Sequence, residues 1–594
     1  MQELQDKLAA TASAALHALF NVELEGEKIA FQETRPEFVG DFTLVVFPFT
    51  KGSKLSPEAT GEAIGAYMLA NSPMIASYNT VKGFLNMELK PSVWLQTLQA
   101  GVGHYTLPAR GEKVLVEYSS PNTNKPLHLG HKRTNFLGLA MARIFADAGY
   151  EATTANLVND RGIHICKSMV AYRQLGQGET PESSGMKGDK LVGKYYVEFD
   201  RLHKAQIADL VAKGVSDEDA AKQTPIMQAA QAELRAWEKG DPDTMALWTL
   251  MNGWVYDGFA VTYKRFGVTF DKYYYESETY LLGKDIVEEG LAKGVFYKEA
   301  NGSVWIDLTP DGLDKKLVLR ADGTSVYITQ DLGTADLKYD DFGANRSVYV
   351  VGNEQDYHFQ VLFLILKKLG RPYAAGLHHL SYGMVDLPSG KMKSREGTVV
   401  DADDLMEEMV QTARARTEEL GKFDSFNPEE QTALYEMLGM GAIKYYLLRV
   451  DPKKRILFNP EESIDLHGNT ATAIQYTHAR IKSVLRKATE QGITPDVEAV
   501  ASYAQMQKEE KALVVLLYQY KAVLNKAANE YAPYLVAQHC YELCRAFNSF
   551  FAAQSILQAD MDAERNFRLV LAREVAGVLE RAMGLLGIAL PERM

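Results

Sequence analysis

The chain has 594 residues, of which 46% are hydrophobic and 24% charged, and its formal net charge is −13. A single hydrophobic core stops growing at about 250 to 300 residues, so we expect several domains. This composition excludes a disordered or fibrous protein. An acidic total lacks the basic footprint that is usual for nucleic-acid binding, although a local basic groove is compatible with it.

The number of cysteines and the absence of long apolar runs indicate where in the cell the protein is expected. Three cysteines cannot form a disulfide framework, and their spacing lacks a zinc pattern, so we expect a reducing compartment and no structural metal. The first residues, MQELQDKLAATASAALHALF, lack a basic segment followed by an apolar core, and no run of about 18 apolar residues occurs. We therefore expect a cytoplasmic protein with no membrane partner.

Hydrophobic patterning divides the chain into three predicted domains. Residues 1–110 combine an amphipathic helix with a β-branched and aromatic stretch at 42–49, which indicates a small α+β domain. Residues 111–459 contain short apolar strands followed by turns and helical stretches, typical of a parallel α/β sheet. Residues 460–594 are nearly all helical, with an apolar stripe at Leu535, Cys540, Leu543, Phe547 and Phe550.

The segment VLVEYSSPNTNKPLHLGHKR predicts a strand, a turn and a helix from about Lys132 to near Gly149. A helix start favours anions because its free N–H groups and its dipole point outward. His128 and His131 can donate hydrogen bonds to phosphate there, and Gly130 would let adenine approach the backbone. A metal site lacks enough acidic or sulfur ligands nearby, and two ordinary surface histidines are the remaining alternative.

A second cationic segment, KMKSREGTVV, begins at Lys391 after a Pro-Ser-Gly turn. Lys391, Lys393 and Arg395 would stabilise charge that develops on a transferred phosphoryl or nucleotidyl group. A solvated charge cluster is the alternative interpretation. Asp401 and Asp404 are candidate caps for a helix that follows.

The HxGH and KMSKS-like motifs together resemble a class I aminoacyl-tRNA synthetase, whose catalytic domain has a Rossmann-type fold. Eight stretches further resemble the arginyl-tRNA synthetase family, in this order: SSPNTNKPLHLGH, LVNDRGIH, SVYITQDLGTA, GNEQDYHF, YGMVDLPSGKMKSREG, GAIKYYLLR, GNTATAIQYTHARI and GLLGIALPERM. The resemblance implies activation of L-arginine with ATP, bound as its Mg²⁺ complex, and transfer of arginine to the terminal adenosine of its tRNA. We expect a monomer.

The resemblance implies that ATP is bound by the two motifs and one downstream histidine: His128, Gly130, His131, Lys391, Met392, Lys393, Ser394 and His358. The loop departs from a full KMSKS pattern because Ser394 stands where a second lysine is expected. In many members of the family a lysine before the first motif replaces it, which matches Lys125. Lys391 and Lys393 are the alternatives, so the expected catalytic residues are His128, His131, Lys125, Lys391 and Lys393.

Recognition of arginine requires carboxylates, because a guanidinium is always charged and presents a rigid fork of donors. The resemblance implies a pocket formed by Glu117, Asn122, Glu276, Tyr327, Asp331 and Gln355. We expect Glu276 and Asp331 at the guanidinium end, and either Glu117 or Asn122 near the α-amino group. For each residue, an ordinary role in a turn, loop or helix cap is the alternative.

The resemblance also implies that the N-terminal domain contacts the tRNA elbow and that the helical domain binds the anticodon. Tyr476 is a candidate for stacking on an unpaired base, and His478 and Arg480 for phosphate contacts. Two rival functions are another class I synthetase and a non-catalytic RNA-binding paralogue. The absent zinc spacing argues against cysteine as substrate, the carboxylates argue against an acidic one, and the intact signature residues argue against a paralogue.

Overall fold

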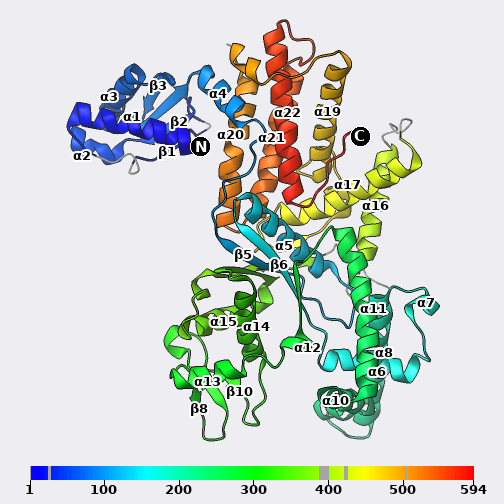
Figure 1. The fold of residues 1–594 in the computed structure, drawn as a ribbon. Coiled ribbons are helices and arrows are strands. Elements are labelled where there is room, and N and C mark those ends of the chain that lie inside the picture. Colours follow the sequence, from blue (N-terminus) through cyan, green and yellow to red (C-terminus); the bar gives the residue numbers. More distant parts are fainter. Residues whose placement is uncertain (1, 24–28, 36, 387–400, 420–425, 504) are drawn as a thin grey trace.

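The computed structural model describes residues 2–23, 29–35, 37–386, 401–419, 426–503 and 505–594. Figure 1 shows an N-terminal lobe that projects to one side, a central sheet with two large insertions below it, and a helical bundle above. Among the described residues, no helix has the length and apolarity needed to cross a bilayer.

The N-terminal lobe is an antiparallel sheet of order β1-β2-β4-β3, packed against helices. The β-branched and aromatic stretch at residues 42–49 forms a strand only as far as Val45, because the Phe-Pro-Phe sequence that follows forms a turn of 3-10 helix. Proline has no N–H to donate to a strand ladder. The elements are α1 (Gln2–Phe20), β1 (Phe31–Glu33), β2 (Phe42–Val45), η2 (Phe47–Phe49), α2 (Thr50–Ser53), α3 (Pro57–Asn71), β3 (Ile75–Val81), β4 (Phe84–Leu89) and α4 (Pro91–Gly101).

The central sheet has five parallel strands in the order β12-β11-β5-β6-β7. They are β5 (Lys113–Glu117), β6 (Glu151–Val158), β7 (Lys272–Tyr275), β11 (Arg346–Gly352) and β12 (Leu377–Tyr382). The chain builds outward from β5 through β6 to β7, then returns to the other side of β5 with β11. Ligands of such sheets bind beyond the carboxyl ends of the strands at this reversal, so the site is expected beside β5 and β11.

Helices connect these strands, and two insertions interrupt the sheet. Helix α5 (Leu129–Asp147) follows β5 and packs against β5, β6 and β11. The first insertion, between β6 and β7, contains α6 (Ile163–Leu175), α7 (Pro181–Ser184), α8 (Gly188–Ala212), α9 (Asp217–Gln223), α10 (Pro225–Glu238) and α11 (Pro242–Phe266). The second, between β7 and β11, contains α12 (Glu276–Thr279), α13 (Lys284–Ala292), β8 (Tyr297–Lys298), β9 (Val304–Ile306), η3 (Thr309–Asp311), β10 (Lys316–Leu319) and α14 (Tyr327–Phe342).

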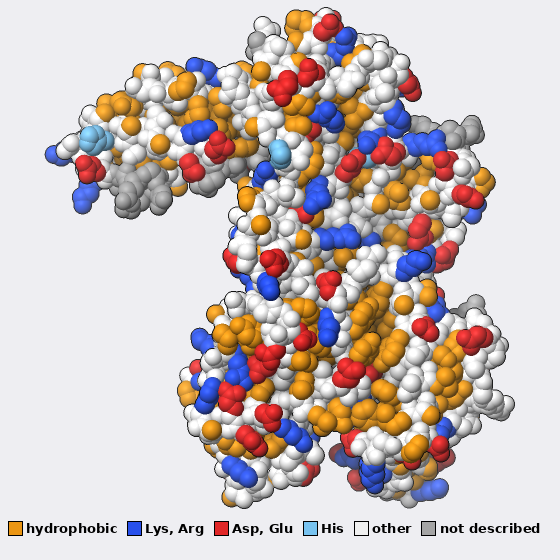
Figure 2. Space-filling model, in the orientation of Figure 1, with side chains coloured by type: hydrophobic (Ala, Val, Ile, Leu, Met, Phe, Trp, Pro, Cys, Tyr) orange, Lys and Arg blue, Asp and Glu red, His pale blue; other side chains and the backbone are white. Residues whose placement is uncertain are grey.

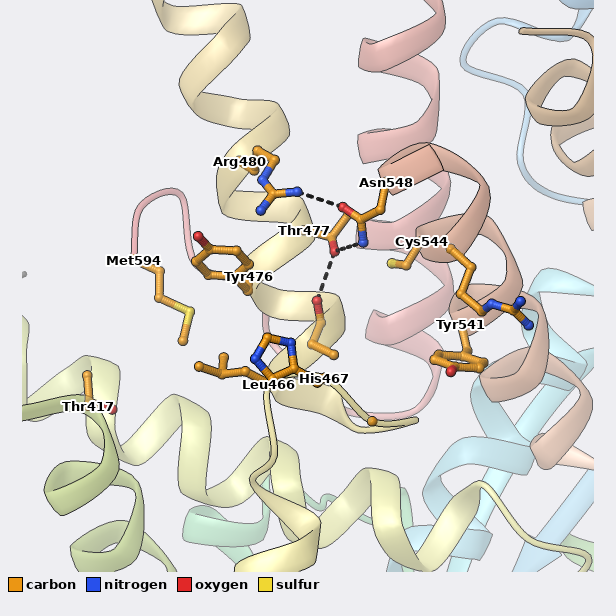
Figure 3. A pocket seen from close by; sticks show the side chains of 13 residues that line it. Thr417, Leu466, His467, Tyr476, Thr477, Arg480, Tyr541, Cys544, Asn548 and Met594 are labelled. Carbon is orange, nitrogen blue, oxygen red and sulfur yellow. Dashed lines mark hydrogen bonds between the residues drawn. The ribbon is translucent and has the colours of Figure 1, made fainter. Parts of the chain in front are cut away.

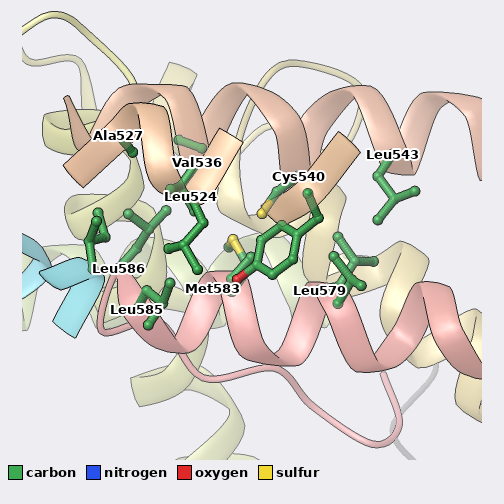
Figure 4. Close-up of a cluster of buried hydrophobic side chains, with 14 of the residues drawn as sticks. Leu524, Ala527, Val536, Cys540, Leu543, Leu579, Met583, Leu585 and Leu586 are labelled. Atoms are coloured by element: carbon green, nitrogen blue, oxygen red, sulfur yellow. The ribbon is translucent and has the colours of Figure 1, made fainter. Parts of the chain in front are cut away.

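The remaining elements lead from the sheet into the helical bundle. They are η4 (Asn353–Gln355), α15 (Asp356–Lys368), η5 (Ala374–Gly376), β13 (Val385–Asp386), α16 (Ala402–Glu419), α17 (Pro428–Leu448), β14 (Ile456–Leu457), α18 (Pro460–Ser463), α19 (Ala471–Glu490), η6 (Glu498–Ser502), α20 (Lys508–Asn529), α21 (Pro533–Ala553) and α22 (Asp562–Leu585). Figure 4 shows the bundle core, where Leu524, Cys540, Leu543, Leu579 and Met583 meet without solvent exposure. The predicted stripe lies in this core, except that Leu535 is only half-buried.

Candidate active site

Helix α5 begins at Leu129, three residues earlier than predicted, because the HLGH motif caps its own helix. Nδ1 of His128 accepts a hydrogen bond from the backbone N–H of Gly130 (3.1 Å), and Nδ1 of His131 accepts one from the backbone N–H of His128 (3.1 Å). This reciprocal arrangement is a capping box. Serine, threonine or glutamate usually supplies its side chains, so standard capping patterns in the sequence did not reveal it.

These contacts fix the protonation of both rings. Each Nδ1 is an acceptor, so in the neutral ring the proton is assigned to Nε2. Burial lowers the pKa of His128 to about 4, and the charge of Lys125 adds to the effect. Burial, followed by the influence of His128 and Lys125, holds the pKa of His131 well below its ordinary value. Near neutral pH, two uncharged Nε2–H donors therefore stand at the start of the helix.

The His128 ring leaves little space for a side chain at Gly130. A Cβ added there would lie 3.0 Å from Cε1 of the His128 ring, tighter than ordinary van der Waals contact. The ring centres of His128 and His131 are 4.0 Å apart, so the pair forms one compact unit. A side chain at position 130 would thus crowd the neighbouring histidine ring, whereas the sequence suggested only access for adenine.

Lys125 is half-buried in the turn before the motif, and burial lowers the pKa of its ammonium group. Its charge acts on His128 and His131, which places a cation beside the two donors. Lys391, Met392, Lys393 and Ser394 lie outside the described residues, so the second motif cannot be compared with Lys125. The choice among the three lysines stays a prediction.

The chain that follows the second motif returns to the first. The backbone N–H of Ala402 donates to the carbonyl of Leu127 (2.9 Å), and Asp401 forms an antiparallel bridge with His128. Asp401 also accepts from the backbone N–H of Asp403 (2.7 Å) at the start of α16, in keeping with the predicted cap. The start of α16 is therefore tied directly to the histidine motif.

The carboxylates predicted for a guanidinium come from two elements that follow the end of β7 in the chain. Glu276 follows β7 and Asp331 lies in the second turn of α14. Burial raises the pKa of Glu276 to about 7, with Asp160 and Asp331 adding to the rise and Arg161 opposing it. Carboxylates that disfavour each other's ionisation in this way are suited to a cationic ligand.

His358 belongs with these carboxylates. Its Nε2 lies 2.6 Å from Oδ2 of Asp331, and both side chains are about one-third exposed. The sequence predicted His358 as an ATP contact, whereas its observed partner is Asp331, a residue predicted to bind arginine. This contact orients the Asp331 carboxylate.

The other predicted pocket residues face solvent near the carboxyl ends of the strands. Tyr327 is 76% exposed and precedes Asp331 by one helical turn, so the two share a face of α14. Gln355 is exposed in the 3-10 turn after β11. Asn122 is exposed and forms a parallel bridge with Asn159 beyond β6. All three are accessible to a ligand.

Glu117 is an exception, and the observed contacts do not support its predicted role. Its residue is only 6% exposed, and its carboxylate pairs with the ammonium group of Lys338 in the core. The Lys338 ammonium group also lies 5.0 Å from the centre of the Tyr349 ring. Redirecting Glu117 to an α-amino group would leave the buried lysine unpaired, at considerable cost. Of the two candidates for the α-amino group, Asn122 is the one that remains accessible.

Sequence reasoning missed Asp160, which follows β6 in the LVNDRGIH stretch. Its carboxylate is 1% exposed and accepts hydrogen bonds from the backbone N–H (2.8 Å) and hydroxyl (2.7 Å) of Ser277 and from the hydroxyl of Tyr256 (3.0 Å). It thereby fixes the chain next to Glu276. The only signal was the acidic turn after a strand, and no spacing connected it to Ser277.

A separate cavity of about 510 Å³ lies between α19 and α21. Figure 3 shows that Tyr476 and Arg480 line it together with Asn548 and Met594, and Thr417 of α16 reaches its edge. The guanidinium of Arg480 donates to Oδ1 of Asn548 (2.9 Å) and lies 5.0 Å from the centre of the Tyr476 ring. These two predicted tRNA contacts therefore share one cavity.

His478 requires a correction. It is fully buried, its Nδ1 lies 2.9 Å from the carbonyl oxygen of Pro591, and its Nε2 lies 2.8 Å from a carboxylate oxygen of Glu580. Position 478 is two residues from Tyr476 and therefore points away from it on the helix. A ring with both nitrogens occupied inside the protein cannot contact phosphate, and its role is to hold the C-terminal segment.

The surface charge and the potential metal ligands also bear on the predictions from the sequence. Figure 2 shows lysine and arginine side chains interspersed with acidic ones over the face in view, in keeping with the acidic net charge. Within the part of the chain that the structure describes, no group of three or more His, Cys, Asp and Glu side chains is arranged to hold a metal ion.

A parallel sheet with a histidine-capped helix at its reversal, joined to a helical C-terminal bundle, has the architecture of class I aminoacyl-tRNA synthetases. Residues 96–459 match the family model described as tRNA synthetases class I (R), catalytic domain, and residues 474–594 match the DALR anticodon binding domain. The chain is 56% identical to the arginine–tRNA ligase of Amoebophilus asiaticus over 98% of both chains, and 51% identical to that of Bacteroides thetaiotaomicron over 100% of both.

The fold is also similar to a solved structure, the Thermus thermophilus arginyl-tRNA synthetase, with a TM-score of 0.79, 25% identity and full coverage of both chains. The chain belongs to the arginyl-tRNA synthetase family. The predicted fold class and family are thereby confirmed, and the rival functions are not favoured.

Proposed function

We propose that the chain activates L-arginine with ATP and transfers the arginyl group to the 3′-terminal adenosine of its tRNA. Family membership supports this activity. The observation that carries it is the presence, along one sheet edge, of neutral donors on His128 and His131 and of the carboxylates Glu276 and Asp331. The first pair suits phosphate oxygens, and the second suits a guanidinium.

In the first step, a carboxylate oxygen of arginine attacks the α-phosphorus of MgATP, and the bond to the bridging oxygen breaks to release pyrophosphate. The attacking carboxylate is already ionised at neutral pH, so no general base is needed. Nε2–H groups of His128 and His131 donate to the phosphate oxygens as negative charge builds on them, and Lys125 contributes a cation. Fixed neutral donors need no reorganisation during the reaction.

Arginine is held at the other end of the site. The carboxylates of Glu276 and Asp331 accept from the guanidinium, with Tyr327 and Gln355 shaping the pocket and Asn122 near the α-amino group. Amino acids without a guanidinium would leave these carboxylates unpaired, and this penalty would discriminate against them.

In the second step, the 2′-hydroxyl of the terminal tRNA ribose attacks the arginyl carbonyl and releases AMP. We propose that Tyr476 stacks on an unpaired anticodon-loop base and that Arg480 contacts phosphate in the same cavity. Residues 1–110 would contact the tRNA elbow, residues 111–459 would form the catalytic domain, and residues 460–594 the anticodon-binding domain. We further propose a monomer that acts in the cytoplasm.

Pyrophosphate exchange into ATP, measured with each of the twenty amino acids with and without bulk tRNA, tests the proposal. Exchange with arginine alone, and only in the presence of tRNA, is the expected result. Exchange with another amino acid would contradict the pocket assignment. A complete lack of exchange under all conditions would contradict activation itself.

A further inference from the structure

Arg161 is a buried cation beside the chain segment that carries Glu276, and nothing in the reaction described above uses it. Its side chain is only 10% exposed. The guanidinium carbon lies 3.9 Å from the centre of the Tyr280 ring and 5.1 Å from that of Trp237, and one nitrogen lies 3.2 Å from a carboxylate oxygen of Glu238. Two aromatic rings and one carboxylate therefore cage the group, an arrangement that suits guanidinium better than ammonium.

The cage joins two parts of the chain. Trp237 and Glu238 end helix α10 of the first insertion, whereas Tyr280 follows α12, the short helix that starts with Glu276. The preceding residue, Asp160, binds Ser277 through its carboxylate. The turn after β6 thus fixes both the backbone beside Glu276 and the cation near it.

The charges around Glu276 are unbalanced without Arg161. Asp160 from the turn after β6 and Asp331 from α14 both disfavour ionisation of Glu276, as does burial. His358 of α15 contacts Asp331, and Glu278, Tyr275 and Tyr256 are the other titratable groups on the neighbouring elements. Arg161 is the cation that opposes these groups, and it lowers the pKa of Glu276.

We propose that Arg161 is a positioning residue for arginine recognition: its caged guanidinium, fixed beside the segment that carries Glu276, favours the ionised form of that carboxylate. The cage also holds this internal guanidinium away from the carboxylates that the substrate must reach. A protonated Glu276 would be a poor partner for the substrate guanidinium, so the empty pocket depends on a resident cation. The inference rests on the proposed assignment of arginine to Glu276 and Asp331.

Arg161→Gln removes the charge and keeps a planar polar end. If the loss of the charge lowers the acid dissociation constant of Glu276 about tenfold, the KM for arginine should rise about eightfold at about pH 6.5. At about pH 8.5 it should rise less than about twofold. The kcat at saturating arginine and the KM for ATP should stay within about twofold at each pH. Arg161→Lys keeps the charge, so its pH dependence should match that of the unaltered chain. Exchange assays with bulk tRNA, and calorimetric titration with arginine, measure these effects.

A matched control is Arg173→Gln. Arg173 lies on α6 in the same insertion and pairs with Glu233 of α10 (3.0 Å), so its loss also weakens the packing of the insertion. Its loss should leave the pH dependence of the arginine KM unchanged. Thermal unfolding reports whether each variant is folded, and Arg161→Met replaces Arg161→Gln should the latter not fold.

A uniform rise in the arginine KM at all pH values in Arg161→Gln, or a Lys variant that behaves like the Gln variant, would overturn the inference. So would a Gln or Met variant with the pH profile of the unaltered chain. Failure of the proposed function has a different signature, because the unaltered chain would then show no arginine-dependent exchange at any pH.

Discussion

The two ends of the proposed site solve the problem of binding a charged ligand in different ways. At the nucleotide end, His128 and His131 are tied to backbone N–H groups and are held neutral by burial. At the amino-acid end, Glu276 and Asp331 act through charge, and burial pushes the pKa of Glu276 up to about 7. In the proposed site, hydrogen-bond geometry would therefore control binding of the nucleotide, whereas the ionisation of Glu276 would control binding of the amino acid.

The largest expected effect is at the charged end. Glu276→Gln should lower kcat/KM for arginine by about 10² to 10³, because truncating one partner of a desolvated charge pair costs about 2 to 5 kcal/mol. Pyrophosphate exchange as a function of arginine concentration measures it. Glu117→Gln is the control, since that carboxylate pairs with Lys338 and its loss should lower thermal stability instead. An equal loss of arginine affinity in both variants would remove the distinction.

At the neutral end, His131→Ala should lower the kcat of activation by about 10², the scale for losing one transition-state donor. The KM for arginine should change by no more than about threefold, because the imidazole serves the phosphate. Single-turnover adenylate formation separates the two quantities. A loss confined to arginine affinity would contradict the assigned role.

The pH dependence should differ between the ends. Glu276 must be ionised to bind a guanidinium, so the KM for arginine should rise as the pH falls through about 7. Well below that pH, the KM should rise almost tenfold for each decrease of one pH unit. His128 is protonated only near pH 4, and burial likewise holds the pKa of His131 well below its ordinary value, so kcat at saturating arginine should stay flat between about pH 6 and 8. Steady-state exchange kinetics over this range test both statements. A kcat that falls with an apparent pKa near 6.5 would indicate a titrating histidine and contradict the neutral end.

The smallest effect is expected in the cavity between α19 and α21. Arg480→Gln should raise the KM for tRNA about fivefold, in line with one lost phosphate contact of about 1 kcal/mol. Pyrophosphate exchange at saturating tRNA should be unchanged. The buried His478 provides the contrast, because His478→Gln should lower the unfolding temperature without a comparable change in the tRNA KM. Matching effects of the two variants would argue against a specific contact of Arg480.

The predicted fold class rests on local signals, and most of these were sufficient. Alternating strands, turns and helices indicated the parallel sheet, and the apolar stripe of α21 indicated the bundle, because both patterns depend on residues close in sequence. The start of α5 was missed by three residues, because histidines seldom form capping boxes. Only the first half of the β-branched and aromatic stretch at residues 42–49 forms a strand, because Pro48 lies in the 3-10 turn that follows it.

The pocket was harder to predict, because its residues come from separate elements. The motif signatures proposed Glu276 and Asp331 for the guanidinium, which stays a prediction, and they could not show that Glu117 pairs with Lys338, which lies more than two hundred residues away. The link from Asp160 to Ser277 spans 117 residues and has no sequence pattern. His478 and Arg480 look alike as candidates in the sequence, and only burial separates them.

Helix α16 has one further consequence. Its first residue, Ala402, is hydrogen-bonded to Leu127 beside the histidine motif, and Thr417 near its other end reaches the cavity that Arg480 lines. A helix of 18 residues is a stiff rod about 27 Å long. One rigid helix therefore contacts both Leu127, beside the histidine motif, and the cavity between α19 and α21. A tilt of this helix at the cavity end would therefore move the backbone that is hydrogen-bonded to Leu127, next to the histidine motif.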